Sequence, residues 1–173
     1  MLVSKHKSAG FTLIEMMIVV VIMAIVSSIA YPSFRDMIIN SQVRNATESI
    51  VNGLQKARAE AVARNTNVSF TLGTGTSWTV DVVSPASTIE TRNSGEGSAI
   101  VTRITTPATS TTVTFNNFGG VATANAAAPT VPLTQVDLTA TNADKPLQVQ
   151  ILTGGNTRMC DPSLSYSSNP RGC

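Results

Sequence analysis

The sequence is poor in the side chains that enzymes and metal sites use. It contains one histidine, His6, and two cysteines, Cys160 and Cys173, among 173 residues. No serine–histidine–acid combination is therefore available beyond residue 6. Two thiols without a nearby histidine make a poor zinc site, and the aspartates do not have calcium-loop spacing. We expect no enzymatic activity, no metal and no other cofactor.

Charge is also scarce, because charged residues make up only 13% of the chain and the formal net charge is +2. Both excess charges lie in residues 1–10, as Lys5 and Lys7. Without that segment, ten basic residues balance ten acidic ones. This balance argues against a generally basic DNA-coating protein, although it leaves room for a local basic patch.

What the sequence does contain is a long hydrophobic run near its N-terminus. Leu13–Tyr31 is apolar except for one glutamate and two serines. At about 1.5 Å per helical residue, Phe11–Tyr31 extends roughly 30 Å, the thickness of one bilayer core. Because Lys5 and Lys7 precede the run, the positive-inside rule places the N-terminus in the cytoplasm and the rest outside.

The position of the leader relative to this run is unusual. A secretory signal has its cleavage site after the apolar stretch, whereas the natural break here, between Gly10 and Phe11, comes before it. Cleavage there would remove the basic residues and retain the helix. One carboxylate, Glu15, lies inside the run, where insertion costs about 2.5–3.5 kcal/mol and such groups are usually functional. The alternative is a plain signal anchor in which Glu15 has no role.

Residues Gly10-Phe-Thr-Leu-Ile-Glu15 resemble the class III signal of type IV pilins and secretion pseudopilins. The resemblance implies that a prepilin peptidase cuts between Gly10 and Phe11 and methylates the new amino terminus of Phe11. It also implies that Glu15 pairs with the amino terminus of a neighbouring subunit and sets the axial register of a filament.

The helix is expected to continue beyond the run. Pro32, which has a counterpart in pilins, is expected to kink it. Apolar residues then recur every three or four positions, which predicts an amphipathic helix whose apolar stripe packs on a sheet. The stripe comprises Ile39, Val43, Ala46, Ile50, Leu54, Ala57 and Ala61. We interpret the charged residues of this segment, Arg58 among them, as a solvated surface, and expect Gly53 to weaken the helix slightly.

From Val68 onward the hydrophobic period changes to that of strands. Expected strands are Val68–Leu72, Trp78–Val83, Ile89–Arg92, Ile100–Ile104, Thr111–Phe115, Gln135–Ala140, Leu147–Leu152 and Arg158–Cys160. The sequence therefore predicts an α+β fold, with a long N-terminal helix packed on an antiparallel β domain. Its expected parts are a leader (1–10), a transmembrane helix segment (11–31), an amphipathic continuation (32–65) and the β domain (66–173).

The two cysteines lie at the C-terminal end, in the part expected outside the membrane. In an oxidising compartment Cys160 and Cys173 most simply pair, which closes a small loop worth about 3 kcal/mol in the chain-entropy model. Metal binding is the alternative.

Four further segments resemble the GspH/FimT/FimU branch of pilin-like proteins. Leu54–Asn65 resembles the branch's helix-to-strand junction, and Phe115-Asn-Asn-Phe-Gly-Gly resembles its Phe-x-x-x-Gly turn. The C-terminal Arg158-Met-Cys and Asn169–Cys173 look most like the FimT/FimU minor pilins.

The resemblance implies a pilin-like fold and a structural minor pilin of a type IV pilus. Such a protein would prime or join pilus assembly in support of twitching, adhesion or DNA uptake. Its partners would be other major and minor pilins, the prepilin peptidase and the inner membrane, from which it would pass into the extracellular pilus. A pseudopilin of a type II secretion system is the alternative.

A third hypothesis is a pilus-borne DNA-binding subunit. FimT-like proteins are linked to DNA uptake through a Gly-Arg-x-Arg stretch, which Gly155-Asn-Thr-Arg158 resembles with one arginine kept. The candidate phosphate contacts are Arg158, Arg171, Arg103 and Lys145, which we expect to converge around the disulfide loop. Such contacts give weak, non-specific, salt-dependent binding. The alternative is that these arginines bond local carbonyls or Asp161.

Overall fold

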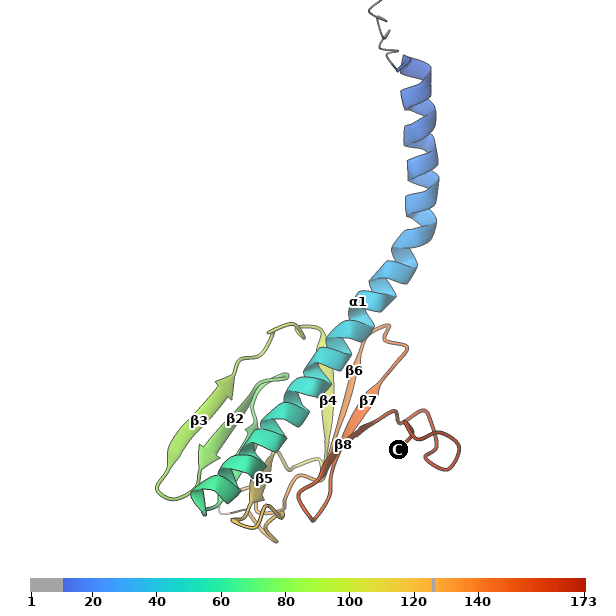
Figure 1. The fold of residues 1–173 in the computed structure, drawn as a ribbon. Helices are drawn as coiled ribbons and strands as arrows, with labels where there is room; N and C mark the ends of the chain where they lie inside the picture. The colour runs from blue at the N-terminus through green and yellow to red at the C-terminus, as the bar shows by residue number, and fades with distance from the viewer. Residues whose placement is uncertain (1–10, 126) are drawn as a thin grey trace, which may run out of the picture. The chain divides into compact units, whose positions relative to one another are not determined.

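The computed structural model describes residues 11–125 and 127–173, so Gly10 and the expected leader lie outside the described residues. The chain divides into two compact units, one ending at Met37 and the other comprising Ile38–Cys173. One helix, α1 (Leu13–Arg64), contributes to both units (Figure 1). It is continuous through Pro32, and the expected kink stays a prediction.

Both ends of α1 are capped by neighbouring side chains or backbone. The Glu15 N–H donates to Thr12 Oγ1 at 3.3 Å, as expected for a threonine that precedes the first turn. At the other end Asn65 has a φ of 50°, in the left-handed region, and the Thr66 N–H donates to the carbonyl of Ala61 at 3.2 Å. Helices commonly end in this way, with asparagine as an alternative to glycine.

The second unit contains two four-stranded sheets in which every pair of neighbours is antiparallel. The first has the order β3-β2-β1-β5 and comprises β1 (Val68–Leu72), β2 (Trp78–Val82), β3 (Ser87–Arg92) and β5 (Thr112–Phe115). The second has the order β4-β6-β7-β8 and comprises β4 (Val101–Thr106), β6 (Gln135–Ala140), β7 (Leu147–Ile151) and β8 (Thr157–Cys160). All eight expected strands are present, with ends that differ by at most two residues.

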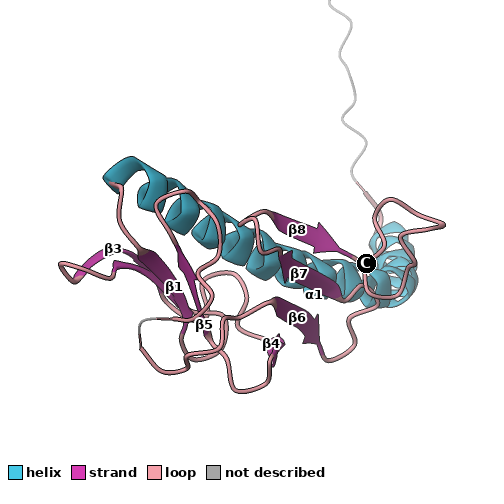
Figure 2. Cartoon of the chain, turned by 90° about the horizontal axis from the view of Figure 1, so that it is seen from below, coloured by secondary structure: helices cyan, strands magenta, loops and turns pink. Residues whose placement is uncertain are grey.

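Within this unit, α1 runs along both sheets: in the view of Figure 2, β1, β3, β4, β5 and β6 are below the helix, and β7 and β8 overlap it. The expected apolar stripe is confirmed, since each of its seven residues is buried in the core. Alternate residues of β1 and β2, including Val68, Phe70 and Val80, are buried in the same cluster. The α+β prediction of one helix packed on antiparallel sheets is therefore confirmed.

Gly53 has a role that helix propensity does not indicate. A Cβ atom at this position would lie 2.7 Å from Cε2 of Phe70 and 3.1 Å from the Trp78 ring. The two aromatic rings are themselves in contact, with centroids 5.7 Å apart, and the Trp78 Nε1–H donates to Ser49 Oγ at 2.9 Å. The missing side chain of Gly53 thus lets α1 approach the sheet closely.

Candidate functional site

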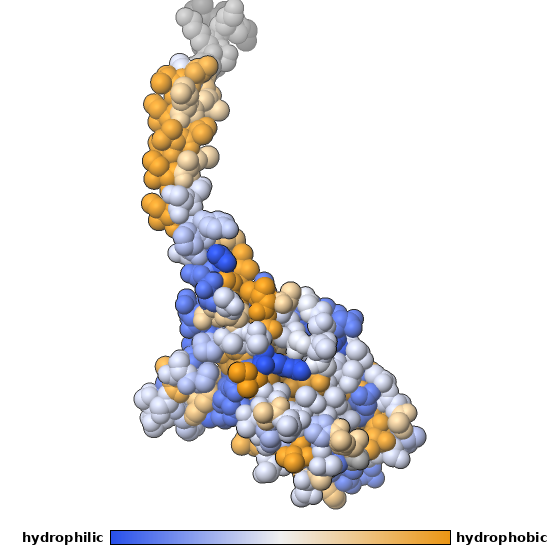
Figure 3. Space-filling model, turned by 180° about the vertical axis from the view of Figure 1, so that it is seen from behind, coloured by the Kyte–Doolittle hydropathy of each residue, from blue (hydrophilic) through white to orange (hydrophobic). Residues whose placement is uncertain are grey.

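The first half of α1 exposes all of its large apolar side chains. Those in Leu13–Tyr31 are between 42% and 80% exposed, and they form the continuous hydrophobic surface of this segment in Figure 3. By length and composition α1 could cross a membrane, since it contains an 18-residue window of mean hydropathy 2.6 with none of that window buried. A surface of this kind requires lipid or other apolar helices around it.

The residues expected to act in processing and assembly lie at the start of this helix. Phe11 is 79% exposed and precedes the first turn, and Glu15 lies within it. Among the described residues no ion pair includes Glu15. The position of its carboxylate near the positive end of the helix dipole is favourable.

At the other end of the chain, the two cysteines are joined in a disulfide with Cα atoms 5.1 Å apart. The closed loop folds back on itself, because the Asp161 N–H donates to the carbonyl of Arg171 at 2.8 Å and the Cys173 N–H to the carbonyl of Asp161 at 3.3 Å. The loop is thus held by backbone hydrogen bonds as well as by the covalent bond.

Arg158 fastens this loop from β8. Its Nη2 donates to the carbonyls of Gly172 at 2.6 Å and Pro170 at 3.2 Å. Its guanidinium also lies 4.3 Å from the centroid of the Tyr166 ring, in cation–π geometry. Arg158 therefore matches the alternative to DNA binding, in which the guanidinium bonds local carbonyls.

The structure does not gather the four candidate cations in one place. Arg171 is exposed in the loop beside Arg158, and exposed Lys145 is in the β6–β7 turn, at the sheet end where Gln148 pairs with Cys160. Arg103, however, is on β4, at the opposite edge of the sheet from β8. Three strand spacings, roughly 14 Å, separate those edges, so the expected convergence is wrong for Arg103.

Arg103 instead links the two sheets. Its Nη2 donates to the carbonyl of Gly73 in the β1–β2 turn, and its Nη1 is buried with no partner among the described residues. Burial lowers the pKa of Arg103 from its ordinary value. These contacts make it a structural residue.

The prediction that Arg58 belongs to a solvated surface is wrong. Its Nε donates to the carbonyl of Gly119 at 2.9 Å and its Nη1 to Asn156 Oδ1 at 2.8 Å. The two turns that it joins also touch each other, because a Cβ on Gly155 would lie 1.8 Å from the Gly119 oxygen. Asn156 stands where the Gly-Arg-x-Arg resemblance would have an arginine, and there it accepts a hydrogen bond from Arg58.

Around Arg58 lies an open groove of about 760 Å³. The groove is lined by Gln55, Arg58, Ala59, Val62, Ala63, Phe118, Gly155, Asn156 and Thr157. In the sequence, the Phe115–Gly120 motif and Gly155 mark the two turns beside this groove. Neither of them indicates which residue of α1 the turns contact.

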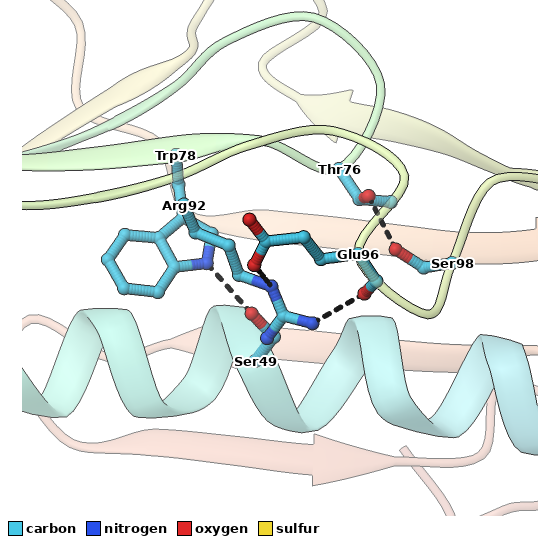
Figure 4. A network of polar contacts seen from close by, with 6 residues as sticks. All are labelled: Ser49, Thr76, Trp78, Arg92, Glu96 and Ser98. Carbon is cyan, nitrogen blue, oxygen red and sulfur yellow. Dashed lines mark hydrogen bonds and ion pairs between the residues drawn. The ribbon is translucent and has the colours of Figure 1, made fainter.

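A second, polar network holds the β3–β4 loop against the end of β3 and the β1–β2 turn (Figure 4). Arg92 donates through Nη2 to the carbonyl of Glu96 at 2.7 Å, and Thr76 and Ser98 share a buried hydrogen bond of 2.7 Å. This network is a structural support for the loop.

The described residues contain no group of three or more histidine, cysteine, aspartate or glutamate side chains that could hold a metal ion.

The chain matches one known sequence motif and one known protein family. Residues 5–31 match the prokaryotic N-terminal methylation motif, and residues 46–155 match the family described as type II transport protein GspH. The second match covers the stripe from Ala46 onward, the first sheet, and β4, β6 and β7 of the second sheet. It ends just before β8 and includes every lining residue of the groove around Arg58 except Asn156 and Thr157.

Two crystal structures of the type IV minor pilin FimU of Pseudomonas aeruginosa are similar to this structure. One, at 18% sequence identity, has a TM-score of 0.53 over 70% of this chain and 94% of that chain. The other, at 20% identity, has a TM-score of 0.54 over 73% of this chain and 90% of that chain. At these identities the likeness concerns the fold, which is the pilin-like fold expected above.

Proposed function

Since this chain belongs to the GspH family of pilin-like proteins and carries the N-terminal methylation motif, we propose that it is a minor pilin of a type IV pilus. In this role it primes or joins pilus assembly. It is held in the inner membrane by the first half of α1, with its N-terminus in the cytoplasm, and then passes into an extracellular filament. There the same apolar surface packs against the helices of other pilins.

The observation that carries this proposal is that every large apolar side chain in the apolar half of α1 is exposed. A window of mean hydropathy 2.6 with nothing buried is stable in lipid or among other apolar helices, and not in water. A protein that is extracted from the membrane into a filament exchanges the first environment for the second. The likeness to FimU supports the choice of a pilus.

Glu15 has a defined part in this proposal. After cleavage between Gly10 and Phe11, the new amino terminus is a cation at the start of the helix. The Glu15 carboxylate of one subunit pairs with the Phe11 amino group of a neighbour, which removes the cost of an unpaired charge among apolar helices. That pair sets the axial register of the subunits.

The experiment is mass spectrometry of filaments sheared from cells that make the full-length chain and cannot retract pili. We expect an N-terminal peptide that begins at methylated Phe11. Glu15→Ala should leave the processed protein in the membrane and reduce its amount in filaments about tenfold, the effect of roughly 1.4 kcal/mol. Met16→Ala, the control, removes an exposed apolar side chain and keeps the carboxylate. Equal incorporation of Glu15→Ala and wild type would disprove the role of Glu15.

A type II secretion pseudopilin is the second candidate, and the description of the matched family favours it. The same experiment separates the two. Processed protein that stays in the membrane and is absent from sheared pili, together with loss of type II secretion when the chain is deleted, would replace the first proposal by the second.

A further inference from the structure

The groove around Arg58 has two large apolar side chains that the chain itself leaves uncovered. Phe118, at the tip of the turn after β5, is 86% exposed, and Val62 on α1 is 51% exposed. Ala59 and Ala63 extend the apolar wall along the helix. Apolar side chains that gather in a concave site, unlike single ones scattered over a surface, mark places where another molecule binds.

The walls of this groove are already in place. Arg58 bonds both turns, and the backbones of Gly119 and Gly155 are in direct contact. Both glycines have a φ of 78°, which only glycine adopts without strain. A partner would therefore spend little free energy on ordering the groove.

The charge of Arg58 indicates what that partner carries. Both of its hydrogen-bond acceptors are neutral, a carbonyl and an amide oxygen. None of the lining residues is acidic, and no ion pair in the described part of the chain includes Arg58. Beside apolar walls the attraction of a guanidinium for a carboxylate is stronger than in open water. The groove thus fits an apolar side chain with a carboxylate close to it.

We propose that the groove is a docking surface for a segment of another subunit in the same filament. That segment places a large apolar side chain against Phe118 and Val62 and a carboxylate against Arg58. The inference rests on the proposed function. Its partner follows from charge complementarity, because Arg58 is a cation with neutral acceptors only, in a groove whose lining includes no acidic residue. A neighbouring subunit in the same filament is the partner that the proposed function supplies.

The test is photo-crosslinking in cells that build the filament. The full-length chain carries benzoylphenylalanine in place of Phe118, the cells are irradiated, and the crosslinked peptide from sheared filaments is identified by mass spectrometry. We expect a peptide from another pilin-like subunit with an Asp or Glu within four residues of the crosslink. The control places the same group at Ile104, which is 63% exposed on β4 and does not line the groove. This control should not give that peptide.

Variants of the groove then test its chemistry. Arg58→Gln should lower the crosslinking yield about tenfold, the scale of a lost charge-assisted hydrogen bond, and Arg58→Lys should retain most of it. Because Arg58 also holds the two turns, Ala63→Glu serves as an independent variant. Its negative charge repels the partner's carboxylate, while both hydrogen bonds of Arg58 are kept. The crosslinking yield should therefore fall as much as in Arg58→Gln. Thermal unfolding of each variant checks that the fold is kept.

The proposal is overturned if the crosslinked peptide comes from a protein outside the filament or has no nearby carboxylate, or if Arg58→Gln or Ala63→Glu crosslinks as wild type does. In those cases the peptide that begins at methylated Phe11, found in sheared filaments, leaves the proposed function intact. If that peptide is absent from the filaments of wild-type cells, the proposed function fails and the docking surface with it.

Discussion

The two halves of α1 are both rich in apolar residues, yet they reach opposite states of burial. From Leu13 to Tyr31 the large apolar side chains are all more than two-fifths exposed, whereas in the second half Val43, Ile50 and Leu54 are fully buried. The difference comes from how apolar residues are arranged. A single stripe can be covered by one sheet, but a helix that is apolar all round cannot.

This contrast assigns different tasks to the two halves. The second half finds its partner within its own chain, so its apolar residues contribute to the free energy of folding of the unit Ile38–Cys173. The described residues of the first half bury none of their large apolar side chains, so in the proposed function these side chains determine where the protein is located and what it assembles with. Substitutions of the same kind in the two halves should therefore change different observables.

The largest expected effect comes from Leu54→Ala compared with Ile22→Ala. Leu54 is fully buried and Ile22 is 54% exposed. We expect Leu54→Ala to lower the free energy of unfolding by about 2–5 kcal/mol, because it leaves a cavity, and Ile22→Ala to change it by less than about 0.5 kcal/mol. Denaturant unfolding of the full-length chain in detergent, followed by the fluorescence of the only tryptophan, Trp78, measures both. A similar loss in both variants would contradict the contrast.

Much of this fold could be predicted because its signals are local. The period of the stripe and the alternation within each strand depend on neighbouring residues alone, and the stripe from Ile39 to Ala61 and all eight strands were predicted. The pairing of strands is not local. β4 lies between β3 and β5 in the chain but belongs to the other sheet, and β5 returns to pair with β1. Alternation within a strand carries no information on which neighbour it takes.

The second expected effect is that of Gly53→Ala, for which sequence and structure predict stability changes of opposite sign. Helix propensity favours alanine by about 1 kcal/mol. The structure places the new Cβ 2.7 Å from Phe70 and 3.1 Å from Trp78, so we expect a destabilisation of about 1–3 kcal/mol by overpacking. Denaturant unfolding followed by Trp78 fluorescence measures which sign the change in the free energy of unfolding has. Gly154→Ala is the control, because nothing lies within 4 Å of its Cβ. A stabilised Gly53→Ala would show that the helix does not need this close approach.

The candidate site was less predictable than the fold, since its residues act through partners far away in the chain. The helical position of Arg58 indicates the direction of its side chain but not that the side chain reaches Gly119 and Asn156. Arg158 was singled out for its charge, whereas its guanidinium is engaged by Tyr166 and two carbonyls. Long, flexible side chains take their roles from tertiary contacts, and these have no local signal.

The smallest expected effect concerns the DNA hypothesis. Arg158→Ala plus Arg171→Ala removes two charges at the disulfide loop. Of the two, only Arg171 is exposed and makes no side-chain hydrogen bond within the described part of the chain. We expect DNA retention by the full-length chain at low salt to fall by about twofold or less.

Arg44→Ala plus Arg64→Ala provides the matched control. Their side chains are 68% and 50% exposed on α1, so this pair lowers the net charge equally without touching the loop. Equal, small effects in the two double variants would show that DNA responds only to overall charge. The slope of the logarithm of the DNA affinity against the logarithm of the salt concentration reports the number of phosphate contacts. If this slope falls by the equivalent of about two contacts in the Arg158/Arg171 variant alone, the disulfide loop is a DNA site. The function of the β unit would then extend beyond its contacts with other subunits.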